Sequence, residues 1–292
     1  MKHFFKRHQG RGSYDLFSNY SHYLPGVGGM FMLFFLFLVG SLLGQLMLLL
    51  MQSVSSEFAE IYGVVITYPV MFIPPMLYAS AMSRRNEFAP WCADGSEPAS
   101  IALDRNDFGR LGGLKLALIT TTATIATAFV VEPVNAMLPE MPEVLKQVLE
   151  GLTNGPLWIS LLSVSIFAPF FEEWLCRGIV LRGLLQKMNP FVAITISAAF
   201  FAVLHMNPWQ AIPAFVLGLL FGYVYYKTGS LKLTMLMHCA NNTMAVIISN
   251  IPSLAEAETM KDVMSSWAYI CVYIASIIII AASLVVFKGI RR

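Results

Sequence analysis

"APFFEEWLCRGIVLRG", residues 168–183, places two adjacent glutamates, Glu172 and Glu173, in an otherwise mostly apolar stretch. Most of the stretch lies within residues 156–181, which are long and apolar enough to cross a bilayer as one helix. An ionisable side chain inside such a helix is costly in hydrocarbon, and each one is a functional-site hypothesis by default. The stretch therefore predicts a membrane protein with a polar site inside the membrane.

The composition of the whole chain agrees with a membrane protein. Of its 292 residues, 57% are hydrophobic and 12% are charged, whereas a soluble globular domain usually carries about 25% charged residues. The net charge of +2 is too small to indicate nucleic-acid binding. The four cysteines include no C-x-x-C pair, which argues against a disulfide framework or a thiolate metal site.

Eight segments are candidates for membrane spans, because each is mostly apolar and close to the required length of about 20 residues. They are 28–51, 60–82, 113–131, 156–181, 190–206, 209–226, 231–250 and 265–287. The fifth and sixth are the weakest, since only "HMNPWQAIP" (205–213) separates them. We predict an all-α, polytopic membrane helical bundle of about eight transmembrane helices.

The distribution of Lys and Arg predicts the orientation of this bundle. Short cytoplasmic loops carry an excess of Lys and Arg. With eight spans and a cytoplasmic N-terminus, all but two of the 19 Lys and Arg residues, Lys146 and Lys261, fall on the cytoplasmic side. We therefore expect both termini to be cytoplasmic and the protein to lie in the cytoplasmic (inner) membrane. In the outer segment 132–155, apolar residues such as Val144 and Val148 recur at helical spacing, which predicts an interfacial helix.

Polar side chains that could perform chemistry are concentrated in the second half of the chain. The fourth span carries Glu172, Glu173 and Arg177, the fifth His205, and the seventh His238, Asn241 and Asn242. The first three spans carry essentially no ionisable residues. This segregation predicts one polar chamber built by spans four, five and seven, with the other spans as scaffold.

Helical spacing assigns different roles to the two glutamates. Glu173 and Arg177 are four residues apart, so they share a helix face in the favourable order for an ion pair. Glu172 has Cys176 at the equivalent position and no cation. It must therefore find a partner on another helix, stay protonated or face water. The alternative that both glutamates only hold helices together remains open.

The histidines and asparagines also follow helical spacing. His238 and Asn242 are four residues apart and project from one face of the seventh span, while Asn241 lies about 100° away and is predicted to be a helix-packing amide. A lone histidine in an apolar helix is more often a bonded core residue than a catalyst. Two histidines, an unpaired glutamate and an asparagine in neighbouring spans favour a reactive site.

Three short motifs follow one another on three spans: E-E-x-x-x-R at Glu172, Glu173 and Arg177, F-x-x-x-H at Phe201 and His205, and H-x-x-x-N at His238 and Asn242. Together they resemble the CPBP family of intramembrane proteases, also called the CAAX protease and bacteriocin-processing family. The eukaryotic CAAX prenyl endopeptidase and bacterial self-immunity proteins belong to that family. The resemblance covers about 156–250, the expected catalytic membrane core. Residues 1–155 would supply a basic tail, three spans, a cytoplasmic loop and the outer segment, and 251–292 the last span and a basic tail.

The resemblance implies a helical core whose catalytic cavity opens toward the cytoplasm. By similarity, Glu172 would be the general base that activates water, with His205 assisting. His238 and Asn242 would stabilise the oxyanion of the tetrahedral intermediate. The remaining motif residues Glu173, Arg177 and Phe201 would support the site. The implied function is an endopeptidase that needs no cofactor and cleaves a membrane-associated peptide or a lipidated protein tail within the lipid bilayer.

Three alternatives stay open at this point. Glu172, His205 and His238 could bind zinc with one water, although there is no H-E-x-x-H motif. Membrane carboxylates and histidines also form proton relays in proton-coupled transporters, although no internal repeat is visible. A non-catalytic immunity or scaffold protein could retain the same residues for packing.

The depths of the candidate residues do not coincide if the spans are straight. At 1.5 Å per residue, Glu172 lies about 15 Å, His238 about 10 Å and His205 about 22 Å from the cytoplasmic ends of their helices. A tilt, or a fifth span that starts deeper and ends within the membrane, would bring them together. Irregular backbone at that depth must be buried in protein or face water, so we expect residues 206–213 to line or cap the chamber.

Overall fold

The computed structural model of the chain describes residues 17–88, 99–106, 108–152, 155–255, 257 and 259–290. Within these residues the chain is helical and contains no strand, which confirms the all-α prediction. The basic residues of the two predicted tails, Lys2, Lys6, Arg7, Arg11, Arg291 and Arg292, lie outside the described residues.

Every predicted span coincides with a helix. These are α1 (Val27–Val54), α2 (Ser56–Glu87), α3 (Gly112–Asn135), the continuous helix Leu157–Leu184, α8 (Pro190–Leu204), α9 (Pro208–Thr228), α10 (Leu231–Ser249) and α13 (Ser266–Gly289). Among the described residues, six helices are long and apolar enough to cross a membrane, and α8 and α10 are not among these. The protein is therefore an integral multi-pass membrane protein. The count of eight spans and the orientation of the termini stay predictions.

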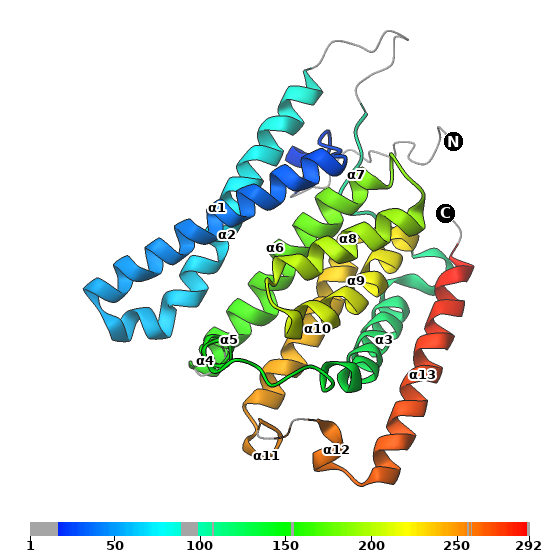
Figure 1. Cartoon of the computed structure of the whole chain (residues 1–292). Coiled ribbons are helices and arrows are strands. Elements are labelled where there is room, and N and C mark those ends of the chain that lie inside the picture. Colours follow the sequence, from blue (N-terminus) through cyan, green and yellow to red (C-terminus); the bar gives the residue numbers. More distant parts are fainter. Residues whose placement is uncertain are drawn as a thin grey trace.

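The helices form a bundle with two outer pairs. In Figure 1, α1 and α2 run as a hairpin along one side, α3 and α13 lie along the other, and Leu157–Leu184, α8, α9 and α10 lie between them. The remaining helices are short: α4 (Glu143–Glu150), α11 (Pro252–Ala255) and α12 (Met260–Val263), with single turns at Ser18–Tyr20 and Gly109–Leu111. The helix predicted in the outer segment is present as α4, and its place at the membrane surface stays a prediction.

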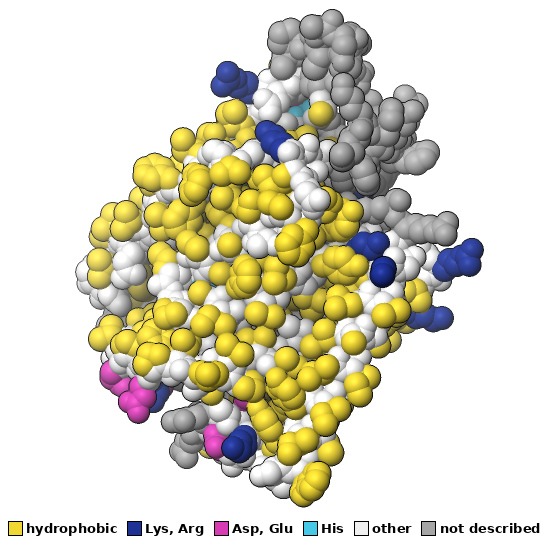
Figure 2. Space-filling view, turned by 45° about the vertical axis from the view of Figure 1, so that its right-hand side comes forward, with side chains coloured by type: hydrophobic (Ala, Val, Ile, Leu, Met, Phe, Trp, Pro, Cys, Tyr) yellow, Lys and Arg dark blue, Asp and Glu magenta, His cyan; other side chains and the backbone are white. Residues whose placement is uncertain are grey.

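The surface of the bundle is apolar where a bilayer would surround it. Figure 2 shows hydrophobic side chains over most of the visible face, with charged side chains gathered toward its two ends. Large apolar residues such as Phe31 and Leu42 on α1 and Ile278 and Val285 on α13 are more than half exposed. Exposed apolar residues in such number are expected where lipid replaces water as the solvent.

The α1–α2 hairpin is held together by a close backbone approach. α2 contains Pro69, Pro74 and Pro75, and a proline cannot donate the backbone hydrogen bond to the carbonyl four residues earlier. The carbonyl of Met71, which loses its donor at Pro75, lies so close to Gly40 of α1 that a Cβ atom there would be 2.1 Å away. Small residues at such contacts are typical of membrane helix pairs.

Arg182 is a structural residue, although in the sequence it counts only as one of the orienting cations. Its side chain is 1% exposed and donates to the carbonyl oxygens of Tyr20 at 2.7 Å, Tyr23 at 2.8 Å and Ser21 at 3.4 Å, and to that of Ile101. Hydrogen bonds from a charged donor are stronger than neutral ones. Arg182 therefore ties the segment before α1 and the loop 99–106 to the end of the helix that carries the two glutamates.

The loop 99–106 fills the end of the bundle that is predicted to be cytoplasmic. The side chain of Leu103 is fully buried, and it lies against Gly178 and beside Leu231. Asp104 fixes this position because its Oδ1 accepts from the N–H groups of Leu231 at 2.8 Å and Lys232 at 3.2 Å. Leu103 therefore packs between the Leu157–Leu184 helix and α10 at this end. The cavity opening that the resemblance implies stays a prediction.

Gly183→Ala is expected to detach the segment before α1 from the bundle. A Cβ atom at Gly183 would lie 2.3 Å from the carbonyl oxygen and 2.6 Å from the nitrogen of Pro25. Backbone cannot give way as a flexible side chain can, so we expect a cost of about 1–3 kcal/mol and faster amide hydrogen exchange in residues 17–26. Gly28→Ala is the matched control, because a Cβ there meets nothing within 4 Å. Equal exchange in the two variants would contradict the prediction.

Candidate active site

The two glutamates lie where the helix Leu157–Leu184 departs from regular α-helical geometry. They end the short α-helix α6 (Ala168–Glu173), which two π-helical segments flank, η3 (Leu161–Phe167) and η4 (Trp174–Leu181). Pro169 at the start of α6 lacks the N–H that would continue the regular ladder. π-helical turns occur frequently at functional sites because they redirect side chains and release carbonyl groups.

Glu173 and Arg177 form the ion pair that their spacing predicts. Arg177 Nη1 lies 2.6 Å from Glu173 Oε1, and both side chains are fully buried. Arg177 Nη2 also donates to the carbonyl oxygen of Gly218 at 3.2 Å. The guanidinium lies over the rings of Phe201 and Phe221, 4.4 and 5.2 Å from their centroids. The pair is therefore part of the packed core, and Phe201 supports it by a cation–π contact.

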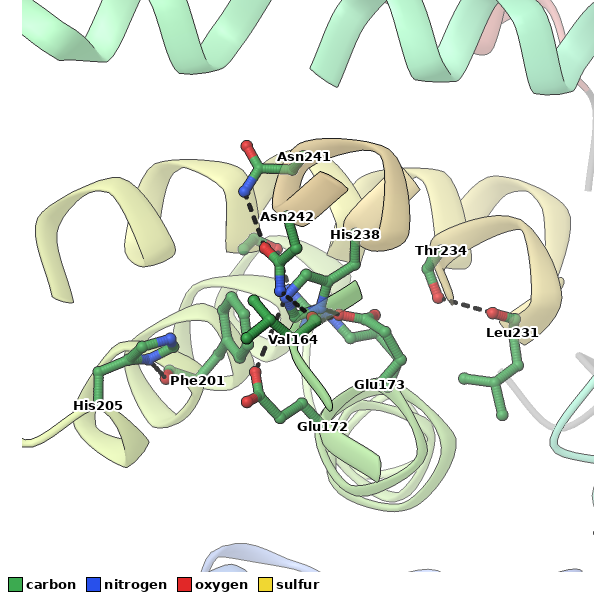
Figure 3. Close-up of polar contacts among 12 residues, drawn as sticks. Val164, Glu172, Glu173, Phe201, His205, Leu231, Thr234, His238, Asn241 and Asn242 are labelled. Carbon is green, nitrogen blue, oxygen red and sulfur yellow. Dashed lines mark hydrogen bonds and ion pairs between the residues drawn. The ribbon is translucent and has the colours of Figure 1, made fainter. Parts of the chain in front are cut away.

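His238 connects the two glutamates. Its Nδ1 lies 3.1 Å from Glu173 Oε1, and its Nε2 lies 3.9 Å from Glu172 Oε2. A carboxylate only accepts hydrogen bonds, so this contact assigns a proton to Nδ1. The second distance is too long for a direct hydrogen bond. Figure 3 shows the imidazole between the two carboxyl groups.

Glu172 has its hydrogen-bond partner on another helix. This is one of the three possibilities that the sequence left open for this side chain. Its Oε1 accepts a hydrogen bond from the hydroxyl of Tyr68 on α2. Its Oε2 is buried and has no hydrogen-bond partner within the part of the chain that the structure describes. Glu173 Oε2 is buried without a hydrogen-bond partner in the same way, and such an atom can bind a water. Glu172 Oε2 is distinguished by the nearby imidazole nitrogen His238 Nε2. Glu172 Oε2 and His238 Nε2 therefore face a common position.

Asn242 is held in a fixed orientation. Its Nδ2 donates to the carbonyl oxygen of Val164 in η3 at 2.9 Å, and its Oδ1 accepts from Nδ2 of Asn241 at 3.1 Å. An amide nitrogen carries two hydrogens, so one N–H of Asn242 can serve another acceptor. Asn241 is predicted as an amide between helices. The structure shows that it donates to its neighbour on α10, and its role in helix packing stays a prediction.

His205 lies apart from this cluster. It follows the last residue of α8, and its Nδ1 lies 3.0 Å from the carbonyl oxygen of Phe201 in the preceding turn. The ring of Phe201 meets both imidazoles edge to face, with centroids 5.2 Å from that of His205 and 5.4 Å from that of His238. In Figure 3 the Phe201 ring separates His205 from His238. A direct contribution of His205 to the activation of water by Glu172 stays a prediction.

The turn after His205 is anchored in protein. Met206 has a positive φ of 53°, a conformation that is uncommon for residues other than glycine. Asn207 caps α9 by accepting from the N–H of Gln210 at 2.9 Å. Trp209 donates through Nε1 to the carbonyl oxygen of Pro139 at 2.9 Å. The fifth helix, α8, has only 15 residues, and the start of α9 is tied to the outer segment. That the fifth span ends within the membrane, and that residues 206–213 line or cap the chamber, stay predictions.

The zinc alternative would need Glu172, His205 and His238 to converge. Across the described ranges, no three His, Cys, Asp or Glu side chains are grouped so that they could hold a metal ion. The separation of His205 from the other two residues explains this for the predicted set. The geometry therefore brings together Glu172, Glu173, His238 and Tyr68, and of these only Tyr68 is missing from the sequence-based prediction.

Comparison with known proteins supports the resemblance seen in the three motifs. Residues 154–244 match the family described as "Type II CAAX prenyl endopeptidase Rce1-like". Over 105 residues the chain is 29% identical to a Bacillus subtilis (strain 168) protein named "Putative membrane peptidase YdiL". That alignment covers 36% of this chain and 42% of the relative, so the chain spans less than half of the relative's length. No solved structure matches the chain.

Proposed function

We propose that this chain is an intramembrane endopeptidase that hydrolyses a membrane-associated peptide or a lipidated protein tail. The observation that carries the proposal is the buried Glu172 Oε2, which accepts no hydrogen bond from any described residue and lies 3.9 Å from His238 Nε2. It lies inside the segment that matches a family of membrane endopeptidases. Peptide hydrolysis requires an activated water and hydrogen-bond donors aimed at the developing oxyanion, and the site offers groups for both.

Glu172 is proposed as the general base. A water beside Glu172 Oε2 and His238 Nε2 donates a proton to the carboxylate while its oxygen attacks the peptide carbonyl carbon. The carbonyl electron pair moves to oxygen and forms the tetrahedral oxyanion. When the carbon–nitrogen bond breaks, the proton on Glu172 passes to the leaving amine, which restores the carboxylate.

Asn242 is proposed as an oxyanion donor, with His238 as the second. Asn242 has one N–H left after its bond to Val164, and Asn241 holds its orientation. His238 already directs its Nδ1 proton to Glu173, so its Nε2 donates to an oxyanion only as an imidazolium. In the neutral form, the same nitrogen can instead accept from the attacking water.

The proposal is tested with the purified full chain in liposomes. The probes are an internally quenched, farnesylated peptide ending in a C-a-a-X tail and the same peptide without the lipid. We expect cleavage that a zinc chelator leaves unchanged. Loss of cleavage with the chelator and its return with added zinc would support the zinc alternative. Proton flux across the same liposomes without cleavage of either peptide would support a transporter instead.

Asn242→Ala is expected to lower kcat by about 10²–10³-fold, the effect of losing one oxyanion donor. Asn250→Ala is the matched control, because Asn250 caps the end of the same helix and its side chain bonds the carbonyl oxygen of Val246 at 2.8 Å, in the preceding turn. The measurement is kcat for both variants on the cleaved probe. Equal rates would remove Asn242 from the proposed mechanism.

A further inference from the structure

The partner of Glu172 comes from outside the segment that matches the peptidase family. Tyr68 belongs to α2, in the first half of the chain, whereas the match covers 154–244. Its hydroxyl donates to Glu172 Oε1. The sequence-based view of the first three spans as scaffold therefore does not describe α2.

A second contact one helical turn away fixes α2 against the same part of the site. Phe72 is fully buried, and its ring stacks on that of Phe171 with centroids 5.2 Å apart and planes 17° apart. Tyr68 and Phe72 are also in contact, with centroids 5.7 Å apart. Consecutive residues of α6, Phe171 and Glu172, thus each meet one residue of α2.

The backbone of α2 is itself held in place at this level. Gly40 of α1 lies against the carbonyl oxygen of Met71, and Gly44 lies near that of Thr67. Thr67, directly before Tyr68, is buried and donates through Oγ1 to the carbonyl oxygen of Gly63 at 2.8 Å. The Tyr68 hydroxyl is therefore presented to Glu172 by a packed helix pair and not by a loop.

We propose that Tyr68 is the positioning residue of the general base Glu172. This rests on the proposed function. By donating to Oε1, Tyr68 fixes the rotamer of a flexible side chain and leaves Oε2 as the oxygen that faces His238 Nε2. Without the hydroxyl, the Glu172 carboxylate is free to rotate. Neither of its oxygens is then held in the position beside His238 Nε2. A base displaced by about 1 Å can lose about 10²-fold in rate.

The test compares Tyr68→Phe with Tyr62→Phe. Tyr62 is on the same helix, and its ring lies near that of Trp158 with centroids 6.4 Å apart, so the control makes the same chemical change away from Glu172. For the peptide that the wild type cleaves, Tyr68→Phe is expected to lower kcat by about 10–100-fold and to leave KM within about two-fold. Tyr62→Phe should leave both constants unchanged.

The link to Glu172 is tested by combining substitutions. If Tyr68 acts through the base, Tyr68→Phe should lower the residual rate of Glu172→Gln no further, whereas independent effects would multiply. A second variant, Tyr68→3-fluorotyrosine, keeps the ring and the hydroxyl but changes its strength as a donor. We expect 3-fluorotyrosine to change kcat when it replaces Tyr68 and to leave kcat unchanged when it replaces Tyr62. Because this substitution keeps the ring and the hydroxyl, it tests the proposal even if Tyr68→Phe does not fold.

The outcomes separate this proposal from the proposed function. An inactive wild type, or a fully active Glu172→Gln, would overturn the proposed function itself. An active wild type and an inactive Glu172→Gln, with Tyr68→Phe equal to Tyr62→Phe in kcat, would overturn only the role of Tyr68. The role of Tyr68 would also be overturned if the double variant showed the product of the two single losses in kcat. Tyr68 would then act independently of Glu172.

Discussion

Glu172→Gln is expected to lower the rate of peptide cleavage by about 10²–10⁴-fold, the usual contribution of a general base. The amide oxygen can still accept the hydrogen bond of Tyr68, so the side chain keeps its anchor on α2. What the variant loses is the basic atom Oε2, which has no hydrogen-bond partner among the residues that the structure describes. The defect should therefore appear in kcat and not in folding.

The measurement is kcat per folded molecule in liposomes, with the amount of folded protein set by size-exclusion chromatography in detergent. Thermal unfolding should give nearly the same Tm for Glu172→Gln and the wild type. Full activity of a folded Glu172→Gln variant would contradict the assignment of Glu172 as the base. A variant that is inactive because it does not fold would instead support the view that both glutamates only hold helices together.

Glu173→Gln, one residue away, is expected to act on stability. Glu173 is the carboxylate that compensates the fully buried Arg177, at 2.6 Å. Removing one partner of a buried ion pair leaves an uncompensated charge and costs about 3–5 kcal/mol. Glu173 Oε1 also accepts from His238 Nδ1 at 3.1 Å. The amide oxygen of the variant can still accept this bond, but it no longer carries the negative charge.

The expected result is a fall in Tm of about 10 °C for Glu173→Gln, since about 1 kcal/mol shifts the Tm of a chain of 150–250 residues by about 2–4 °C. Glu172→Gln is the matched control, because the two substitutions are chemically identical and adjacent. Arg177→Met tests the same pair from the other side. An unchanged Tm for both Glu173→Gln and Arg177→Met would show that the buried pair contributes nothing to the fold.

The parts of the site that the sequence predicts are those set by local helix geometry. Glu173 and Arg177 meet because residues four apart share a helix face. The absence of a cation four residues after Glu172 leaves three possibilities, and a partner on another helix is the one that the structure shows. His238 meets the two carboxyl groups because the ionisable residues of an apolar helix are directed toward other polar groups.

The parts that the sequence does not predict depend on contacts between distant segments. A tyrosine in an apolar span is usually an ordinary packing residue, so nothing near Tyr68 indicates that its hydroxyl meets Glu172, 104 positions later. The π-helical segments η3 and η4 change the register that simple spacing assumes. Spacing also does not place Asn242 on the carbonyl oxygen of Val164.

At the predicted cytoplasmic end, too, the sequence does not predict the contacts between distant segments. Charge counting treats Arg182 as an orienting cation, yet its guanidinium is buried among backbone carbonyl groups. The loop 99–106 has an irregular sequence, but Leu103 and Asp104 pack it between helices. His205 is placed by the short α8 and remains outside the carboxylate cluster. Each of these positions is decided by tertiary packing.

The most direct test of an intramembrane peptidase is the set of membrane peptides in cells that lack this protein, complemented with wild type, Glu172→Gln or empty vector. Quantitative mass spectrometry of the membrane fraction measures the cut and uncut forms. The account predicts at least one membrane-anchored peptide that stays uncut with empty vector and with Glu172→Gln and is cut with wild type. Restored cleavage by a folded Glu172→Gln variant, or identical peptides in all three strains, would contradict it.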